Sequence, residues 1–322
     1  MPLNIGEEKA PVGEDEVIKE LVGLQLAIMQ KTDPSRRGQH AKHHGCVDAS
    51  FVVRDDIPEI YKTGLFKEHS AYHAIVRWSN GGSPDDLAPD IHGMAVKVLG
   101  VKGARALEGI ESDEQDFILI DSEVFFARDV KTLLEFMKAR AASAAKPEVM
   151  KEFAQHDGAT VAQLKASLKN VPSPLAVQYW STVPYKLGNG AVKYTAIPAA
   201  GNGLGDAQPA STDYLRRTMV ARLTEGNTPV VFELAIIPQT DSVTMPIEDP
   251  TVQWGSEPVP VALITVAAQT FDTPERMQRC EAMSFDPWHA LAEHRPLGGI
   301  NRARRAVYPA SVKVRHTARV TT

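Results

Sequence analysis

Short apolar runs bounded by glycine, proline or aspartate recur along the chain and predict β-strands. They lie at 46–54, 72–79, 92–99, 116–121, 191–197, 229–237 and 260–268. Helical periodicity marks 15–31, 129–155 and 158–169, and the first of these helices would end at 33–35. Because strands and helices do not alternate regularly, the order predicts an α+β fold around an antiparallel sheet or barrel, rather than a doubly wound parallel sheet.

The segment before the first predicted helix, residues 1–14, is acidic and has no apolar periodicity, which predicts a loose N-terminal arm. The rest of the chain, 15–322, shows no clear linker and no fixed-period repeat. With 322 residues and 43% hydrophobic content, it is long enough to bury a large core. We therefore expect a single domain at 15–322 after the arm.

Charge and hydropathy narrow the range of partners. The formal net charge of -5 argues against nucleic acid, since phosphate binding needs a basic surface. A basic run from Arg295 to Arg319 is typical of a solvated tail, and alternatively of a surface that binds carboxylates. No stretch approaches the roughly 18 apolar residues needed to cross a bilayer, so we expect no membrane partner.

The chain has two cysteines, Cys46 and Cys280, which are too few for a disulfide framework. Free thiols suggest a reducing compartment. The N-terminal segment also lacks the apolar core of a secretory signal. Together these features predict a cytoplasmic protein.

Three histidines crowd into the segment 37–45, namely His40, His43 and His44. Imidazole is a ligand for zinc, copper and iron. However, the adjacent His43 and His44 cannot both face one ion on a regular element, and no carboxylate or thiolate follows at zinc-like spacing. By itself the segment is more typical of a surface loop.

A second group of reactive side chains lies near the C-terminus. Arg304 precedes Tyr308 by one helical turn and Arg315 follows it by two, so the three lie on one face of a helix. A guanidinium beside a phenol lowers the pKa of the phenol by stabilising the phenolate. A tyrosine oxygen in this form is a known ligand of haem iron. The alternative is a helix whose arginines face water.

The order and spacing of these segments resemble the haem catalases over about residues 30–316. The distal catalase motif, an arginine three residues before a His-Ala pair, corresponds to Arg37, His40 and Ala41. The V-R-F-S strand of the catalases corresponds to VRWS at 76–79.

Three further motifs extend the resemblance. The D-x-x-G-F-A-V-K motif corresponds to DIHGMAVK at 90–97, in which we interpret Gly93 as a tight turn. The run that ends in Phe-Phe-x-Arg-Asp corresponds to 116–129, and the proximal R-x-x-x-Y-P-x-T-x-x-x-R helix to RRAVYPASVKVR at 304–315. The chain is most similar to the short, catalase-related haem proteins of bacteria, especially at 285–308.

The resemblance implies a haem site with two sides. On the distal side it implies His40 as the base that moves a proton between the two oxygens of a peroxide, with Ser79 fixing the tautomer of its ring. On the proximal side it implies Tyr308 as the phenolate ligand of the iron of haem b, with Arg304 stabilising the phenolate.

The same resemblance implies the other contacts of the haem and the fold around it. The propionates would pair with Arg37, Arg77 and Arg315, because bidentate guanidinium geometry fits a carboxylate. Phe125 would lie near the distal pocket, although an adjacent pair of phenylalanines is otherwise typical of core packing. The implied fold is a catalase-like antiparallel β-barrel with surrounding helices.

Two departures from the catalase pattern stand out. Catalases place a distal Asn five residues before the Phe pair, where this chain has Ile120, and Asn80 is a candidate substitute. The chain also stops soon after Tyr308, so we expect it to lack the wrapping segment and the C-terminal helical domain of catalases. That argues against an intertwined tetramer and leaves a homodimer open.

Three functions follow from the resemblance. The first is a haem peroxidase that acts on hydrogen peroxide or organic hydroperoxides with an unknown small-molecule reductant, and that has weak or partial catalase activity. The second is a fatty-acid hydroperoxide isomerase or lyase, for which 179–185 would line an apolar channel. The third is a non-catalytic haem carrier, which would have no need of His40 and Ser79 as a base and its partner.

Overall fold

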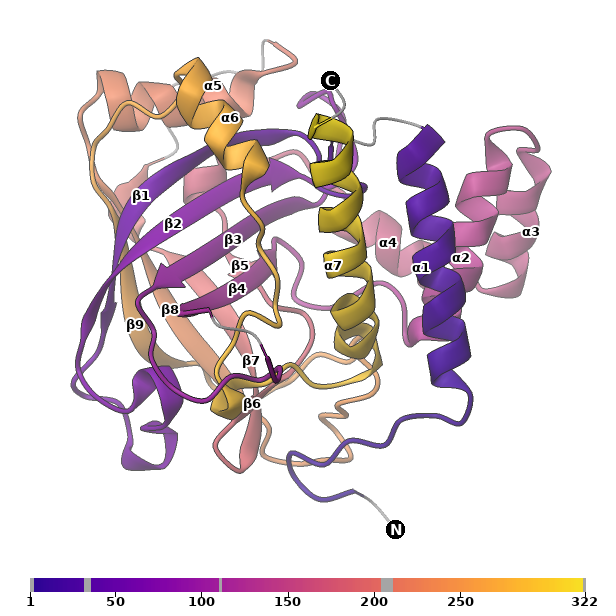
Figure 1. Ribbon diagram of the computed structural model, residues 1–322, viewed down its shortest axis with the longest axis horizontal. Helices are drawn as coiled ribbons and strands as arrows, with labels where there is room; N and C mark the ends of the chain where they lie inside the picture. The colour runs from indigo at the N-terminus through magenta and orange to yellow at the C-terminus, as the bar shows by residue number, and fades with distance from the viewer. Residues whose placement is uncertain (1–2, 32–35, 110–111, 204–210, 321–322) are drawn as a thin grey trace.

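The computed structural model describes residues 3–31, 36–109, 112–203 and 211–320 of the chain. Within these residues the strands form one antiparallel sheet. They are β1 His43–Val53, β2 Ala71–Asn80, β3 His92–Leu99, β4 Glu114–Ile120, β5 Tyr179–Trp180, β6 Tyr185–Leu187, β7 Gly190–Pro198, β8 Val230–Pro238 and β9 Val259–Val266. Neighbours follow the order β5-β4-β3-β2-β1-β9-β8-β7-β6, and β5 also pairs with β7. This additional pairing closes the sheet into a barrel, which confirms the predicted α+β barrel fold (Figure 1).

Helices surround the barrel. They are α1 Glu14–Lys31, α2 Val130–Ser143, α3 Glu148–His156, α4 Gly158–Ser167, α5 Tyr214–Val220, α6 Pro274–Ala282 and α7 Gly299–Val320. Single turns of helix occupy Glu59–Tyr61, Gly64–Phe66, Pro174–Ala176, Ala200–Asn202, Ala221–Glu225 and Ala292–His294. Figure 1 shows α7 between the barrel and α1, with α2 and α3 beyond α1. In the described ranges, none of these helices combines the length and the apolar character required to cross a membrane.

Side chains alternate along β2, β3 and β4 between the barrel core and the outer wall of the barrel. Val76 and Trp78 of β2 are fully buried in the core, together with Met94 of β3 and Phe117 of β4. The intervening side chains face outward and are aligned by the strand pairing in two rows, Arg77–Ala95–Ile118 and Ser79–Gly93–Ile120. These rows form the wall on which the candidate site is built.

The seven predicted strands are present as β1 to β4 and β7 to β9. β5 and β6 were not predicted, because strands of two and three residues carry no periodicity. The predicted helical segment 129–155 is two helices, since Pro147 lacks an N–H and disfavours helix at the residue before it. Gly93 lies within β3 and not in a tight turn. The expected helix stop at 33–35 lies outside the described residues.

The described part of the N-terminal arm is bound to the rest of the protein and is not loose. The Gly6 N–H donates to Gln239 Oε1 at 2.8 Å. Arg302, in the first turn of α7, pairs with Glu8 at 2.9 Å and with Glu14 at 2.9 Å. The acidic composition that suggested a free arm is therefore what attaches the arm to the basic start of α7.

Cys46 and Cys280 form a disulfide that joins β1 to α6, so the expectation of free thiols is wrong. The two residues are 234 positions apart in the sequence, and only the fold brings their Cα atoms to 5.4 Å. Such a separation is normal for a disulfide, for which about 4.4–6.8 Å is usual. Because disulfides persist mainly in oxidising compartments, the cysteine content no longer supports the prediction of a cytoplasmic location.

Candidate active site

A cavity of about 500 Å³ lies between the outer wall of the barrel and the helices α1, α2, α4 and α7. This volume is within the range of roughly 300–1,000 Å³ that is usual for small-molecule and cofactor sites. The cavity receives side chains from both ends of the chain. The predicted site residues all line it, namely Arg37, His40, Arg77, Ser79, Phe125, Arg304, Tyr308 and Arg315. The structure therefore brings the predicted residues together, and their individual roles remain predictions.

His40 enters the cavity from the loop that precedes β1. Its φ of 54° is uncommon for a residue with a side chain, and backbone contacts hold it there. Its N–H donates to the Gly81 carbonyl at 2.8 Å, and its own carbonyl accepts from Arg77 Nη2 at 2.7 Å. The ring Nδ1 lies 3.1 Å from Ser79 Oγ, which is the hydrogen bond expected from the sequence.

Burial, together with the charge of Arg77, lowers the pKa of His40 to about 4. The ring is therefore neutral at pH 7. When Nδ1 donates its proton to Ser79 Oγ, the other ring nitrogen, Nε2, keeps a free lone pair. His40 is thus prepared to accept a proton from a molecule in the cavity.

Gly93 provides the space that the His40 ring occupies. It lies opposite Ser79 in the pairing of β2 with β3. A Cβ at this position would be 2.7 Å from His40 Nδ1, closer than real Cβ atoms approach, and 3.1 Å from Ser79 Oγ, which is a tight contact. The glycine of the D-x-x-G motif is thus required by the packing of the histidine, and not by a turn.

On the helical side of the cavity, α7 presents Arg304, Tyr308 and Arg315, as their spacing predicted. Burial raises the pKa of Tyr308, and the Arg304 guanidinium opposes this rise. Arg304 thus favours a lower pKa of Tyr308, as predicted from the sequence. Burial has the larger effect on this pKa and raises it. The Arg304 guanidinium also lies over the Phe125 ring, 5.9 Å from its centroid, which joins the helix to the loop after β4.

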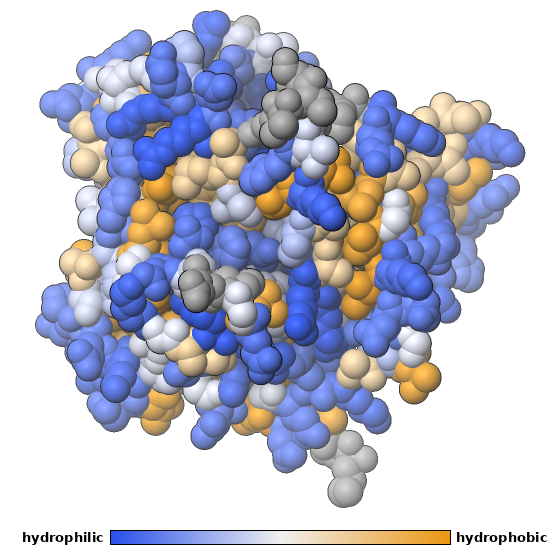
Figure 2. All heavy atoms as spheres, in the orientation of Figure 1, coloured by the Kyte–Doolittle hydropathy of each residue, from blue (hydrophilic) through white to orange (hydrophobic). Residues whose placement is uncertain are grey.

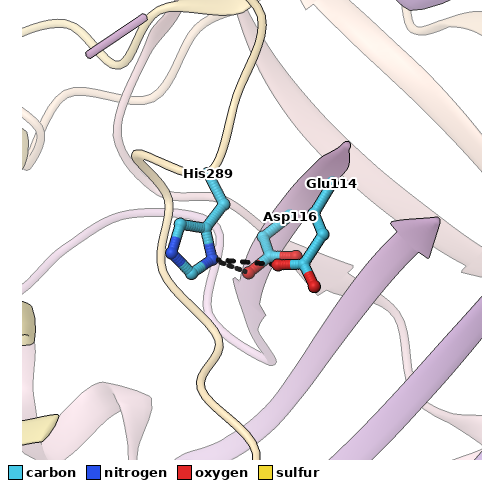
Figure 3. A group of neighbouring side chains, drawn as sticks. All are labelled: Glu114, Asp116 and His289. Carbon is cyan, nitrogen blue, oxygen red and sulfur yellow. Dashed lines mark hydrogen bonds and ion pairs between the residues drawn. The ribbon is translucent and has the colours of Figure 1, made fainter. Parts of the chain in front are cut away.

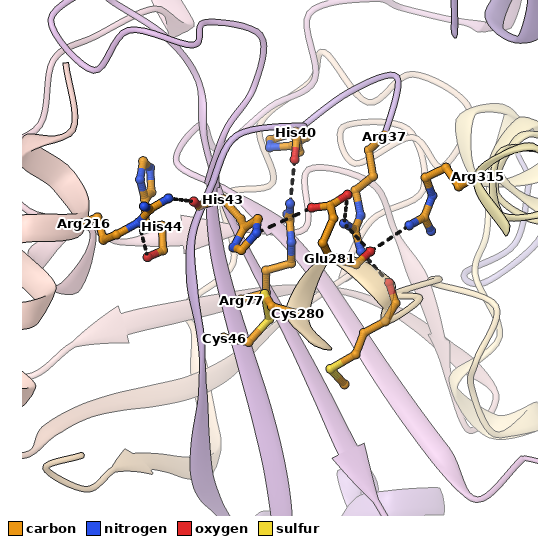
Figure 4. The surroundings of a disulfide bond; sticks show 11 residues. Arg37, His40, His43, His44, Cys46, Arg77, Arg216, Cys280, Glu281 and Arg315 are labelled. Carbon is orange, nitrogen blue, oxygen red and sulfur yellow. Dashed lines mark hydrogen bonds and ion pairs between the residues drawn. A yellow bond between two sulfur atoms is a disulfide. The ribbon is translucent and has the colours of Figure 1, made fainter. Parts of the chain in front are cut away.

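Arg37, Arg77 and Arg315 converge near the disulfide (Figure 4). Arg37 Nη1 pairs with the Glu281 carboxylate at 3.1 Å, and Arg315 Nη1 donates to the Glu281 carbonyl at 3.1 Å. Glu281 follows Cys280 directly, so the disulfide positions the acceptor that two of the arginines share. The sequence analysis did not single out Glu281 for this role, because only the fold brings α6 to the arginines.

Asn80 does not replace the missing distal amide. Its Oδ1 lies 2.9 Å from His44 Nε2, its Nδ2 donates to Asp86 Oδ1 at 2.8 Å, and it does not line the cavity. His44 itself is fully buried, so the surface-loop interpretation of this histidine is wrong. Ile120 lines the cavity in the same row as Ser79, and so presents an apolar side chain where catalases have an amide.

Apolar side chains continue the cavity wall beyond Ile120. They come from the loop after β4, from α2, and from α4 and the residue that follows it, namely Val124, Phe125, Phe126, Leu133, Phe136, Met137, Leu164 and Leu168. The segment 179–185, which we expected to line an apolar channel, is not part of this wall. Its Tyr179 and Tyr185 are buried in the barrel core instead.

A second cluster with metal-binding side chains lies further along the outer wall of the barrel (Figure 3). Glu114, Asp116 and His289 bring carboxylate oxygens and a ring nitrogen within 4.8 Å of one another. Lys97 Nζ is 2.6 Å from Glu114 Oε2 and 2.9 Å from Asp116 Oδ1. The ammonium group occupies the place that a metal ion would take, so the cluster is an internal ion network.

No family model matches the chain. A catalase-related peroxidase of Mycolicibacterium paratuberculosis is 26% identical to it over 299 residues, which is 88% of this chain and 90% of the relative.

Solved structures of catalases share its fold. A fungal catalase superposes with a TM-score of 0.66 at 18% identity, covering 98% of this chain and 65% of that protein. Catalase A from Saccharomyces cerevisiae gives a TM-score of 0.64 at 16% identity, covering 98% of this chain and 67% of the other. The chain thus spans about two thirds of the length of these catalases. The chain therefore has a catalase-like fold and is similar in sequence to a catalase-related peroxidase.

Proposed function

We propose that the protein is a haem-dependent peroxidase that reduces hydrogen peroxide or organic hydroperoxides at the expense of a small-molecule reductant. The observation that carries this proposal is that His40 and Tyr308, from opposite ends of the chain, face one cavity. The name of the sequence relative, catalase-related peroxidase, and the catalase fold support the same class of oxidoreductase.

The residues around the cavity fit haem b. Ala95, which faces outward beside Arg77, gives the barrel wall a low, apolar surface against which a planar macrocycle can lie. Arg77 is only 4% exposed, and its buried Nε has no hydrogen-bond partner among the described residues, as expected of a group that awaits an anionic ligand. Tyr308 lines the cavity and offers an oxygen donor of the kind that binds ferric haem.

Haem, when bound, would supply the redox chemistry that cleaves the O–O bond of the peroxide. Tyr308 Oη would hold the iron, and Arg304 would favour the phenolate form of Tyr308. The two propionates would be bound by Arg37, Arg77 and Arg315.

The distal residues would handle the proton of the substrate. His40 Nε2 would accept the proton from the peroxide oxygen nearer the haem and return it to the outer oxygen, which then leaves as water or as an alcohol. Ser79 would hold the ring through Nδ1 during both transfers. Phe125 and Ile120 would exclude water from the space where the proton moves.

The apolar wall favours organic hydroperoxides as substrates beside hydrogen peroxide. Ile120 offers no hydrogen bond that would orient hydrogen peroxide, so we propose that catalase activity is weak. The same wall favours a second candidate, the isomerase or lyase of fatty-acid hydroperoxides. Turnover of a fatty-acid hydroperoxide without any reductant would support this second candidate.

The proposal is tested first by haem binding. Protein purified after haem supplementation should show a Soret band, and Tyr308→Phe should greatly reduce haem occupancy or shift the ferric spectrum, because the phenyl ring offers no donor atom. Tyr72→Phe, which removes a hydroxyl on the far part of β2, is the matched control and should leave the spectrum unchanged. The absence of a Soret band in the unmodified protein would refute the proposed function, and unchanged binding by Tyr308→Phe would show that another residue holds the iron.

A further inference from the structure

Arg140 lies in the last turn of α2, and its side chain lines the cavity. Its Nη2 is 3.4 Å from the position that a Cβ on Gly82 would take. Gly82 follows Gly81, whose carbonyl accepts the N–H of His40. Along the cavity wall, only Gly81 and Gly82 therefore lie between the Arg140 guanidinium and the backbone of His40, the predicted base.

Arg140 is exposed to solvent and also lines the cavity. Among the residues that the structure describes, none forms an ion pair or hydrogen bond with its guanidinium, and only its carbonyl is engaged, by Ser143 Oγ. The carboxylate that also lines this part of the cavity, Asp90, is directed at backbone N–H groups of Gly82 and Ser83, at 2.9 and 2.7 Å. An unpaired cation thus faces a space whose other walls are largely apolar.

Apolar side chains continue from the cavity to the protein surface beside this cation. Leu168, after the end of α4, lines the cavity and is 38% exposed. Leu87 is 44% exposed, and its carbonyl accepts from Asn170 Nδ2, so it lies next to the same edge. The cavity therefore opens through an apolar rim, and an amphipathic molecule could enter with its hydrocarbon part against these side chains.

We propose that Arg140 binds the carboxylate of an acidic organic hydroperoxide, whose hydrocarbon part lies along the apolar wall and whose peroxide group reaches His40. This inference rests on the proposed function and narrows its substrate class from hydroperoxides in general to carboxylated ones. A guanidinium at the rim of an apolar cavity matches such a molecule in both charge and hydropathy.

A basic residue in the last turn of a helix also stabilises the helix dipole, and that role alone would explain an arginine at this position. It would not require the side chain to line the cavity beside Gly82. Lys131, near the start of the same helix, gives a matched control, because its side chain is 75% exposed and does not line the cavity.

Binding is measured first without turnover. Calorimetry on the haem-loaded protein should show octanoate binding more tightly than the neutral octanamide. Arg140→Gln should abolish this difference, with a loss of about tenfold or more in octanoate affinity, as expected for a charge-assisted hydrogen bond. Arg140→Lys should restore part of it, and Lys131→Gln should retain the preference of the unmodified protein.

Kinetics then test the substrate class. The ratio of kcat/KM for a fatty-acid hydroperoxide to that for its methyl ester should exceed one, and it should fall about tenfold in Arg140→Gln, mainly through KM. If haem is bound and both hydroperoxides react, but the ratio is the same in Arg140→Gln, this inference is wrong while the proposed function stands. If no haem is bound, the proposed function fails. The preference for octanoate over octanamide, and its loss in Arg140→Gln, would then decide whether Arg140 binds a carboxylate.

Discussion

At residue 120 a branched apolar side chain stands in the row of Ser79 and Gly93, where the catalase pattern has an amide. An amide here would be able to donate a hydrogen bond to hydrogen peroxide. We therefore predict that Ile120→Asn raises the kcat/KM for hydrogen peroxide relative to that for an organic hydroperoxide by about tenfold, a modest share of what a positioned donor contributes in other enzymes.

Ile118→Asn is the control for this prediction. It places the same amide in the same cavity, but in the neighbouring row beside Ala95. Steady-state kinetics with both peroxides would measure the two ratios. Equal ratios in the two variants would mean that the position of residue 120 is not special.

The second prediction at the residue scale concerns Gly93. A methyl group here would displace the His40 ring from Ser79, since the new Cβ would lie 2.7 Å from Nδ1. We expect Gly93→Ala to lower kcat by about a hundredfold, because general acid–base catalysis contributes roughly 10²–10⁴-fold. The Soret band should remain, since Tyr308 is unchanged. An unaffected kcat would contradict the assignment of His40 as the base.

At the scale of elements, the disulfide joins α6 to β1 and fixes the segment that carries Glu281. We predict that replacing both Cys46 and Cys280 by serine lowers the free energy of unfolding by about 2–4 kcal/mol, measured by urea denaturation. Haem affinity should fall as well, because Arg37 and Arg315 both contact Glu281. Treatment with dithiothreitol should destabilise the unmodified protein and leave the double variant unaffected. A double variant as stable as the unmodified protein would show that packing alone holds α6.

The sequence predicted a helix or strand correctly where the run of apolar and polar residues was long enough to show a helical or strand period. The seven longer strands and α1 are examples. The prediction failed at Pro147, where continuous helical composition concealed a break. It also failed at β5 and β6, which are too short to show a period and form through long-range pairing, β5 with β4 and β7 and β6 with β7. The helical spacing of Arg304, Tyr308 and Arg315 was sufficient to place them on one face, because neighbours three or four residues apart share a face in any α-helix.

At the scale of the whole molecule, buried neutral histidines should make the protein sensitive to acid. Burial lowers the pKa of His43, His44 and His294 to about 3 each, against an ordinary value of 6.5. His294 Nε2 accepts the Leu65 N–H at 2.9 Å, a contact that protonation would break. The unfolded chain therefore binds protons from pH 6.5 downward, and the folded protein does so only near pH 3.

The stability that these groups contribute is complete above about pH 6.5 and is lost as the pH falls toward 3. We expect the free energy of unfolding to decrease in this window by up to about 1.4 kcal/mol per pH unit for each histidine. Urea denaturation between pH 7 and 4 would measure how the free energy of unfolding changes with pH. His294→Gln should lower this slope by the contribution of one histidine, up to about 1.4 kcal/mol per pH unit. A stability that is constant over this range would contradict the burial of neutral histidines.

The sequence by itself determined the local features of this protein: the strand and helix periods, the face of α7 that carries Tyr308, and the motif order that resembles the catalases. These depend on neighbours within a few turns or strand repeats, so they can be read from spacing alone. Only the tertiary structure decided which distant groups meet. Tertiary packing brings Cys46 of β1 to Cys280 of α6, turns Asn80 toward His44 and places Ile120 in the row of Ser79, because long-range contacts depend on the packing of the whole chain.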